Sequence, residues 1–315
     1  MNFCTIITPG YIHYALSLRE SLLQFNQSVH FYILVSEFQA GLKERIEREF
    51  DKTYLIYAEE ICKEGVAKAI YEKYASTYTD GFRWSIKPVL LMYLMQTRGI
   101  DKIIYTDCDI RFYSDYQFLF DELGCNNVLL TPHWRTSDPH LDETHFISMY
   151  TSGLYNAGFI AVNLKAFKAL EWWAKANLYI CEINASKGQF VDQTHLNLFH
   201  IYFDGVKSLK HRGCNVAGWN MLECRRTPET DGSVTINNQW PVVFVHFSNH
   251  TIHAIKNGED KLLEPHLATY QKRIQYFAAQ LGISVPEEAP PPKREQTPAR
   301  TFASLVSKLI NKGAK

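Results

Sequence analysis

Apolar runs and amphipathic stretches alternate through the first 60 residues of the chain. The runs at 3–7, 29–35 and 53–57 have the length and composition of buried strands. The stretches between them, 14–25 and 41–50, repeat apolar residues at helical spacing, with Leu18, Leu22 and Phe25 on one face of the first. Strands that alternate with helices predict a parallel, doubly wound α/β sheet.

The same patterns continue along the chain and predict one large domain. Further strands are expected at 103–106, at 127–131, after Gly158 and at 242–245, and further helices at 61–78, from a cap at Ser85 through Met95, at 115–123, 166–183 and 262–281. The polar segment 132–152 is predicted to be a loop on the acceptor side of a site. Residues 1–283 thus predict a single α/β domain with a mostly parallel central sheet flanked by helices. Prolines among charges at 284–300 predict an extended linker before a short amphipathic helix at 301–315.

Composition narrows the classes of protein that need to be considered. There are 33 basic and 33 acidic residues, so bulk electrostatics gives no reason to expect a nucleic acid partner. Seven cysteines without a C-x-x-C pair argue against a disulfide framework or a zinc module and favour a reducing compartment. No basic leader precedes an apolar core in residues 1–18, and no window reaches 18 apolar residues. These features predict a soluble or peripheral protein in the cytoplasm.

Two carboxylates follow the apolar strand at 103–106. Asp107 and Asp109 are two residues apart, and in an extended segment such residues point to the same side. Two carboxylates on one side repel unless a cation lies between them, and a hard divalent cation with oxygen ligands is the natural candidate. The alternative is a turn in which both carboxylates are simply solvated.

An apolar strand that ends in D-x-D near residue 100, after alternating strands and helices, resembles the GT-A (Rossmann-like) nucleotide-sugar glycosyltransferases, in particular the retaining family 8-like enzymes. The resemblance implies a Mn²⁺ or Mg²⁺ that bridges the two phosphates of the donor at Asp107, Cys108 and Asp109. It also implies that Thr8 and Tyr11, at the end of the first strand, contact the uracil and ribose, with an ordinary turn as the alternative. A basic residue that meets the base or diphosphate corresponds to Arg83 or Lys87, with a solvated charge at a helix end as the alternative.

Three later segments support the same resemblance. Asn156-Ala157-Gly158 resembles the N-[AS]-G segment whose Asn contacts the donor sugar, and Asp192-Gln193 begins a stretch similar to D-Q-x-x-[LF]-N, beside the anomeric carbon. An ordinary helix cap at Asp192 is the alternative, and His195 is expected to pack rather than act as a base. His246, at the end of the last strand, corresponds to the third protein ligand of the metal, with an ordinary hydrogen-bonded polar residue as the alternative. The usual continuation, a glycine and then Lys-Pro-Trp, is absent, and Lys256 or Lys261 is expected to contact the diphosphate instead.

Together these segments predict a metal-dependent enzyme that moves a hexose-type sugar from a UDP-sugar to a glycan or glycolipid acceptor, with retention of configuration. A catalytically silent sugar-nucleotide-binding module is one alternative. A sugar-phosphate nucleotidyltransferase is another, although residues 8–13 lack the glycine-rich basic loop that such enzymes carry after their first strand.

The C-terminal tail has its own pattern. Its apolar residues fall at helical spacing beside positive charge, at Phe302, Leu305, Val306, Leu309 and Ile310 with Arg300, Lys308, Lys312 and Lys315. A helix this short needs a surface to fold against, which could be an anionic membrane at the inner face, a partner protein or the domain itself.

Overall fold

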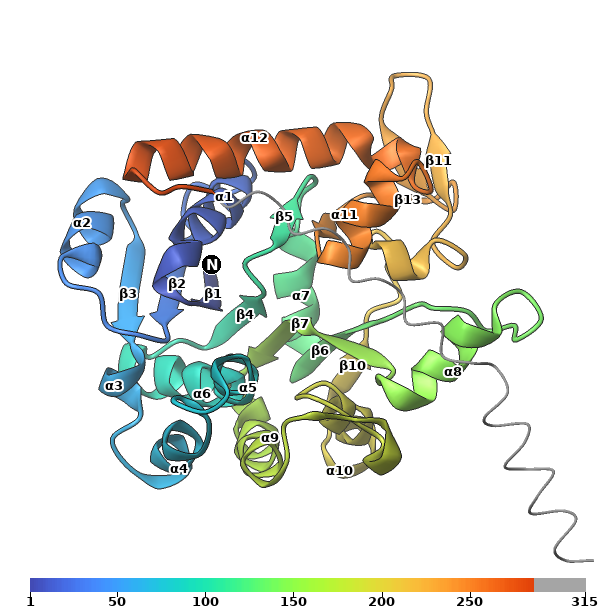
Figure 1. Ribbon diagram of the computed structural model, residues 1–315. Coiled ribbons are helices and arrows are strands. Elements are labelled where there is room, and N and C mark those ends of the chain that lie inside the picture. Colours follow the sequence, from blue (N-terminus) through green and yellow to red (C-terminus); the bar gives the residue numbers. More distant parts are fainter. Residues whose placement is uncertain (286–315) are drawn as a thin grey trace, which may run out of the picture. The chain divides into compact units, whose positions relative to one another are not determined.

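A seven-stranded sheet in the order β10-β6-β7-β4-β1-β2-β3 forms the centre of the computed structural model, which describes residues 1–285 (Figure 1). The strands are β1 Asn2–Ile7, β2 His30–Val35, β3 Thr53–Tyr57, β4 Lys102–Thr106, β6 Val128–Pro132, β7 Tyr155–Asn163 and β10 Val206–Ser208. β7 runs antiparallel to both of its neighbours, and the other pairs are parallel. The predicted mostly parallel α/β sheet is therefore confirmed.

Helices cover both faces of this sheet. One face packs against α1 Ile12–Leu23, α2 Leu42–Glu49, α7 Gln117–Cys125 and α12 Glu264–Leu281. The other face packs against α4 Gly65–Tyr74, α6 Lys87–Arg98 and α9 Phe167–Tyr179. Because both faces are covered, the strands are apolar runs rather than alternating ones; all of β7 except its last residue is buried.

Smaller elements bring the last predicted strand next to the D-x-D segment. β5 Ile110–Phe112 pairs antiparallel with β14 Phe244–His246, and His246 lies opposite Ile110. The remaining strands are β8 Ile183–Asn184, β9 Gln189–Phe190, β11 Arg226–Pro228, β12 Val234–Ile236 and β13 Trp240–Pro241. The remaining helices are α3 Ala58–Ile61, α5 Thr79–Ser85, α8 Glu143–Thr151, α10 Phe199–Tyr202 and α11 Asn249–Lys256, with 3₁₀ turns η1 Pro9–Tyr11, η2 Leu164–Ala166, η3 Ala185–Lys187, η4 Thr194–Leu198, η5 Gly218–Asn220 and η6 Lys261–Leu263.

Several predicted boundaries are wrong, for local reasons. The polar segment 61–78 is not one helix: it contains the last residue of α3 and the whole of α4, and it ends just before α5 begins at Thr79. Ser85 ends α5 instead of capping α6. The predicted loop 132–152 contains α8, which begins where the Asp142 side chain accepts a hydrogen bond from His145 N at 2.8 Å. No residue of α8 is buried, so the helix has no apolar stripe that a sequence pattern could reveal.

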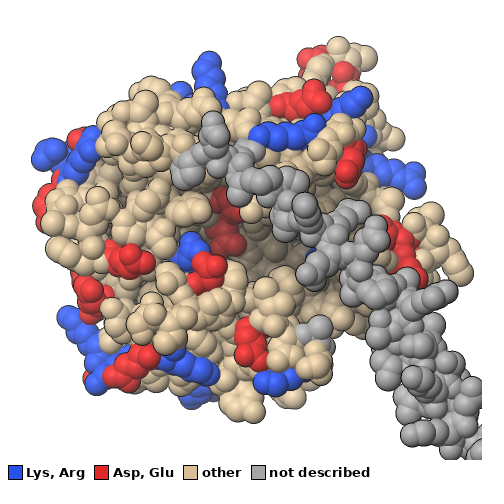
Figure 2. All heavy atoms as spheres, viewed as in Figure 1, with Lys and Arg blue, Asp and Glu red and all other residues tan. Residues whose placement is uncertain are grey.

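The described residues contain no helix that is both long and apolar enough to cross a membrane. The predicted linker from residue 286 onwards and the predicted amphipathic helix 301–315 lie outside the described residues. One face of the molecule is hollowed near its centre, where acidic side chains gather on the wall (Figure 2).

Candidate active site

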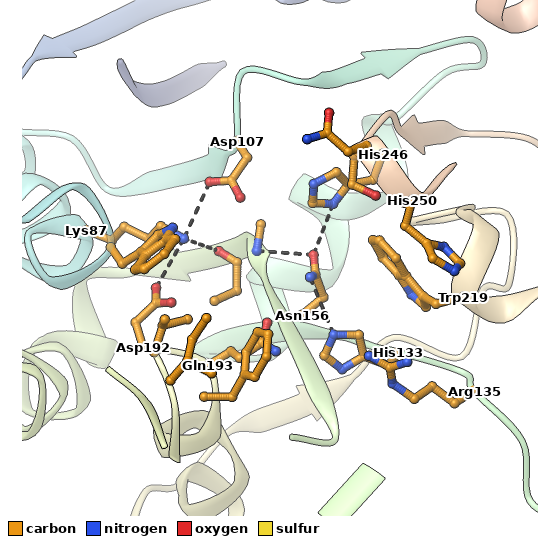
Figure 3. Close-up of a pocket in the computed structure, with 18 residues that line it drawn as sticks. Lys87, Asp107, His133, Arg135, Asn156, Asp192, Gln193, Trp219, His246 and His250 are labelled. Carbon is orange, nitrogen blue, oxygen red and sulfur yellow. Dashed lines mark hydrogen bonds and ion pairs between the residues drawn. The ribbon is translucent and has the colours of Figure 1, made fainter. Parts of the chain in front are cut away.

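Two cavities meet at the carboxyl end of β4. The first, called the aromatic cavity here, has about 430 Å³ and is lined by Tyr11, Tyr14, Arg83, Tyr105, Cys108, Asp109, Phe247 and Tyr270 among others. The second, called the central cavity, has about 490 Å³ and is lined by Asn156, Asp192, Gln193, Trp219 and His246 among others (Figure 3). Their shared wall consists of Trp84, Lys87, Asp107, Ser248 and Asn249.

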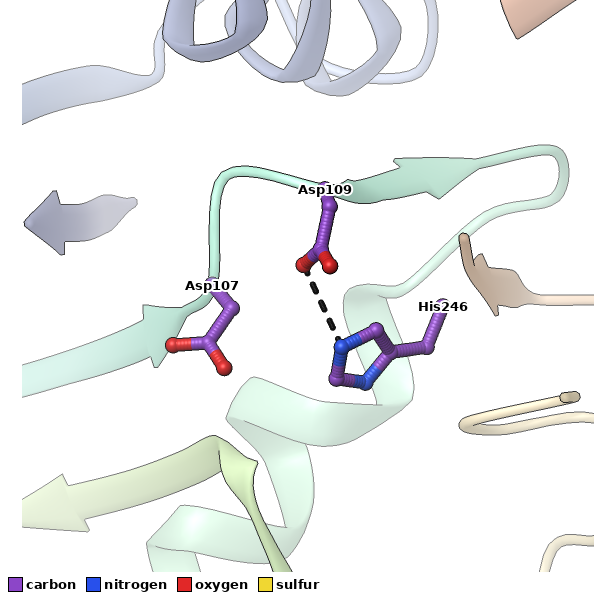
Figure 4. A group of neighbouring side chains, drawn as sticks. All are labelled: Asp107, Asp109 and His246. Atoms are coloured by element: carbon purple, nitrogen blue, oxygen red, sulfur yellow. Dashed lines mark ion pairs between the residues drawn. The ribbon is translucent and has the colours of Figure 1, made fainter. Parts of the chain in front are cut away.

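A cluster of three metal-ligating side chains lies at this junction. One ligand atom from each of Asp107, Asp109 and His246 lies within 4.8 Å of the other two (Figure 4). The two carboxylates follow β4, and the imidazole comes from the end of β14. Asp109 Oδ1 is 3.2 Å from His246 Nε2. Two carboxylates and one imidazole are a donor set that a divalent cation such as Mn²⁺ accepts, so these residues fit the predicted metal site.

Hydrogen bonds orient the His246 ring toward the cluster. Its Nδ1 lies 3.2 Å from Asn156 Oδ1 and 3.3 Å from Asn215 Oδ1, so Nδ1 carries the proton that is donated to these amide oxygens. Nε2 is thereby directed at Asp109. A histidine ligand usually donates its other N–H to such a partner, which fixes the orientation of the ring. Burial works against a charge on His246, but the nearby carboxylates of Asp109 and Asp107 together outweigh burial and raise the pKa of His246.

Gly158 gives the cluster its space. A Cβ at this position would lie 2.5 Å from His246 Cε1, 2.7 Å from Asn156 Oδ1 and 3.0 Å from Asp107 Oδ2. The backbone around it is fixed, because Asp107 N donates to Gly158 O at 2.8 Å and Gly158 N donates to Asn156 Oδ1 at 3.2 Å. The Asn156-Ala157-Gly158 segment therefore shapes the metal cluster as well as lining the central cavity.

Lys87 is an internal counter-ion, not a solvated charge at a helix end. Its Nζ is buried, donates to Ala157 O at 3.0 Å, and lies 3.4 Å from Asp107 Oδ1 and 3.1 Å from Asp192 Oδ2. Burial opposes its charge, but the two carboxylates outweigh burial and raise the pKa of Lys87. Three contacts match the three donors of an ammonium group. Lys87 thus joins the D-x-D segment to Asp192, a connection that the sequence did not suggest.

Asp192 and Gln193 lie in the wall of the central cavity. Asp192 is 1% exposed, and burial, partly offset by Lys87, raises its pKa to about 6. The alternative interpretation of Asp192 as an ordinary helix cap does not hold, because η4 starts after Gln193 and has no side-chain cap. Gln193 Nε2 donates to Ser152 O at 2.5 Å. Val191, just before this pair, has φ +47°, a strained conformation for a β-branched residue that recurs at functional sites.

The structure separates the other predicted residues into two groups. Tyr11, Arg83 and Cys108 line the aromatic cavity, and Arg83 also pairs with Asp80. Thr8 lines neither the aromatic nor the central cavity, and neither do Lys256, in the last turn of α11, and Lys261 in η6. His195 Nε2 donates to Ile180 O at 2.9 Å, which is consistent with the expected packing role.

Sequence reasoning missed several cavity residues. His133 and Arg135 belong to the segment 132–152, which was predicted to lie on the acceptor side of a site but was given no site residues, and Trp219 lies in a Gly- and Asn-rich segment. Their aromatic and basic character inside such segments was the available signal. Tyr270 reaches the aromatic cavity from the middle of α12, and no local pattern marks it.

Comparisons with known proteins agree with this geometry. The model of Glycosyl transferase family 8 matches residues 4–251. Two proteins of Bacillus subtilis (strain 168) are similar: the uncharacterized protein YfnF is 24% identical over 257 residues, covering 80% of this chain and 82% of YfnF, and the uncharacterized protein YfnD is 26% identical over 261 residues, covering 80% and 78%.

Two solved structures share the fold. Galactosyltransferase LgtC, crystallised with donor and acceptor sugar analogues, superposes with a TM-score of 0.56 at 16% identity, over 91% of this chain and 98% of LgtC. The glycosyltransferase GlyE of Streptococcus pneumoniae TIGR4 superposes with a TM-score of 0.50 at 14% identity, over 92% of this chain and 65% of GlyE. Because the family match spans most of the sequence, the chain belongs to glycosyl transferase family 8 and is a glycosyltransferase with the GT-A fold.

Proposed function

We propose that this enzyme transfers a hexose from a UDP-sugar to a glycan or glycolipid acceptor, with Mn²⁺ or Mg²⁺ at Asp107, Asp109 and His246 and with retention of configuration. The observation that carries the proposal is that the aromatic and central cavities meet at this cluster. A nucleotide sugar has its diphosphate between a flat nucleoside and a polar sugar. The order of aromatic cavity, metal cluster and central cavity suits those three parts.

The chemistry of each cavity supports this assignment. Rings such as Tyr11 and Tyr270 offer flat surfaces to a base, and Arg83 offers charge to a phosphate. In the central cavity, Asn156, Asp192 and Gln193 offer polar groups to sugar hydroxyls. A cation bound at the cluster would offset the charge on the departing diphosphate, a Lewis-acid role that needs no proton donor. The imidazole of His246 favours Mn²⁺ over Mg²⁺, which prefers oxygen ligands.

Asp192 lines the central cavity, which is the proposed sugar subsite. With a pKa of about 6 it is mostly ionised at neutral pH, so it can stabilise positive charge that develops at the anomeric carbon. Its ion pair with Lys87 makes it a poor nucleophile. We therefore favour attack by the acceptor hydroxyl on the face from which UDP departs, which retains the configuration, with Asp192 and Gln193 holding the donor sugar.

A calorimetric titration of UDP with and without Mn²⁺ tests the binding half of the proposal. Metal-dependent binding is expected, and its absence would contradict the site. Release of UDP from UDP-Glc, UDP-Gal, UDP-GlcNAc and UDP-GalNAc then tests catalysis, and NMR of the product gives its anomeric configuration. Metal-dependent UDP binding without release from any donor would favour a silent binding module.

The location of the enzyme is proposed from its tail sequence. The apolar stripe and basic residues at 300–315 suit an anionic surface, so we infer a cytoplasmic enzyme that is peripheral to the inner face of the membrane. A lipid-linked acceptor would give it a reason to be there.

A further inference from the structure

A third cavity adjoins the central cavity and shares His133 and Arg135 with it. This side cavity has about 320 Å³, and its other lining residues include Trp134, Ser137, Tyr155, Ser208, Lys210, Arg212 and Glu223. Figure 3 shows Arg135 next to His133 at the edge of the central cavity. A molecule that occupies the side cavity can therefore extend past Arg135 toward the proposed sugar subsite.

The charges that line the side cavity do not balance. Arg135, Lys210 and Arg212 are basic, and Glu223 is the one carboxylate among the described residues of this lining. Glu223 is already engaged: Oε2 lies 3.1 Å from Arg212 Nη1, and Oε1 accepts from Ser137 N at 2.9 Å and from Ser137 Oγ at 2.7 Å. Arg135 and Lys210 remain as an excess of two positive charges.

Of Arg135 and Lys210, Arg135 has the charge whose burial is more unfavourable. Its guanidinium is largely buried, and burial lowers the pKa of Arg135. One Nη2–H donates to Ser152 Oγ at 3.2 Å, and its buried Nε has no hydrogen-bond partner among the described residues. A buried charge with neutral partners is unfavourable unless an anion joins it. A guanidinium in this situation is suited to an incoming oxyanion, which it can bind through two parallel hydrogen bonds.

Trp134 arranges the other two cations. Arg212 Cζ lies 4.3 Å and Lys210 Nζ 5.5 Å from the centre of its ring, which are cation–π distances. Trp134 has φ +50°, a strained conformation for a large residue, and such strain persists where the surrounding structure enforces it. The indole thus positions Lys210 and Arg212 in the lining of the side cavity.

We propose that the acceptor is anionic, and that its phosphate or carboxylate group binds in the side cavity at Arg135 and Lys210 while its reacting hydroxyl faces the central cavity. This inference rests on the proposed function and adds the chemical class of the acceptor. It places the discrimination between acceptors in the segments that follow β6 and β10, outside the donor site.

A binding experiment tests the anion site without any catalysis. Inorganic phosphate, glucose 6-phosphate, glucuronate and glucose are titrated calorimetrically into the full chain, with EDTA and without UDP. The three anions are expected to bind at least tenfold more tightly than glucose. Arg135→Gln should weaken glucose 6-phosphate binding at least tenfold and Lys210→Gln several-fold. Lys175→Gln, on the exposed side of α9, is the charge-matched control, and Arg83→Gln tests whether the anions bind in the aromatic cavity instead. Anion binding that is lost in Arg83→Gln and kept in Arg135→Gln and Lys210→Gln overturns the inference.

A transfer experiment links the site to the reaction. The value of kcat/KM is compared for methyl glucoside, methyl glucoside 6-phosphate and methyl glucuronide, with UDP release in the absence of acceptor measured alongside. A preference of tenfold or more for a charged acceptor, reduced in Lys210→Gln, supports the inference. Equal use of neutral and charged acceptors by the wild type overturns it.

These two experiments test the proposed function and the anion site separately, and one further pair of acceptors distinguishes a lipid-linked anion from a free sugar phosphate. If no donor releases UDP, the proposed function is wrong, and the binding titrations still show whether anions bind at Arg135 and Lys210. The methyl and decyl phosphodiesters of a hexose 1-phosphate carry the same single negative charge on a short and on a lipid-like molecule. Faster transfer to the decyl compound assigns the anion to a lipid-linked acceptor, and equal or slower transfer assigns it to a free sugar phosphate. Because Lys210 is exposed, its variant is expected to fold even if Arg135→Gln does not.

Discussion

Replacing Gly158 with alanine should damage the metal cluster while leaving the fold in place. The added methyl would lie 2.5 Å from His246 Cε1, about 1 Å closer than carbon atoms at optimal separation. Gly158 does not have a positive φ, so the backbone itself accepts alanine. The clash must instead move a side chain, because strand β7 is held by β4 and β6 on its two sides.

The cost can be worked out from what His246 would lose. Overpacking of a buried site costs about 1–3 kcal/mol. Rotation of the imidazole also weakens its hydrogen bonds to Asn156 and Asn215, which are worth about 0.5–1.5 kcal/mol each. The overpacking cost and the partial loss of these two hydrogen bonds add, so we expect the free energy of unfolding without metal to fall by about 2–4 kcal/mol. Displacement of Nε2 from the cluster should weaken Mn²⁺ binding at least tenfold, since each 1.4 kcal/mol is a factor of ten.

The assay is urea denaturation in EDTA together with a calorimetric Mn²⁺ titration. Gly124→Ala in α7 is the matched control, because its Cβ would meet nothing closer than Lys102 Nζ at 3.6 Å. This control should be neutral or slightly stabilising, as expected for alanine in a helix, and should bind Mn²⁺ like the wild type. Wild-type Mn²⁺ affinity in Gly158→Ala would refute the assignment of His246 to the metal.

Four further predictions can be checked with standard measurements. Asp109→Ala should abolish Mn²⁺-dependent UDP binding in calorimetry. Its free energy of unfolding in EDTA should match that of the wild type, because the carboxylate is one-third exposed and His246 can become neutral. A large loss of stability in EDTA would instead show that the Asp109–His246 pair has a structural role. Lys87→Met should lower the free energy of unfolding by about 3–5 kcal/mol in urea denaturation, since it leaves two carboxylates without their buried cation, whereas Lys175→Met should change it little; equal effects would contradict the role of Lys87. Burial lowers the pKa of His133 to about 3, below its value in the unfolded chain, so the unfolded state binds the proton first as the pH falls. The free energy of unfolding should therefore fall by about 1.4 kcal/mol per pH unit from pH 6.5 towards pH 3. His133→Gln should flatten this slope, and an unchanged slope would contradict its assignment to His133. Deletion after Pro298 should remove low-salt binding to anionic liposomes and leave UDP release intact, and equal liposome binding by both forms would exclude the membrane role.

The fold could be predicted because its signals are local. Strands β1 to β4 are apolar runs bounded by helices with an apolar face, and each boundary depends on neighbours in the sequence. The elements that were misplaced have weak local signals. Helix α8 buries nothing, and the break between α5 and α6 occurs inside a continuous helical pattern.

The site was predicted where one segment carries the chemistry and missed where distant segments share it. Asp107 and Asp109 are neighbours in sequence, and His246 was found through the resemblance to family 8. Nothing near residue 87 indicates that its ammonium group meets carboxylates 20 and 105 residues away. Such a pairing depends on how α6 packs against the ends of β4 and β7, which only the folded chain determines.

The absent Lys-Pro-Trp continuation illustrates the same limit. The sequence suggested a replacement lysine further along the chain, yet Lys256 is in the last turn of α11 and lines neither cavity. Ser248, at the other end of this helix, accepts a hydrogen bond from Thr251 N and lines both cavities together with Asn249. The N-terminal end of a helix carries partial positive charge and free N–H groups, whereas its C-terminal end carries the opposite charge. We therefore expect α11 to face the diphosphate with its N-terminal end, so that backbone N–H groups and Arg83 take the part that a lysine has in other family members.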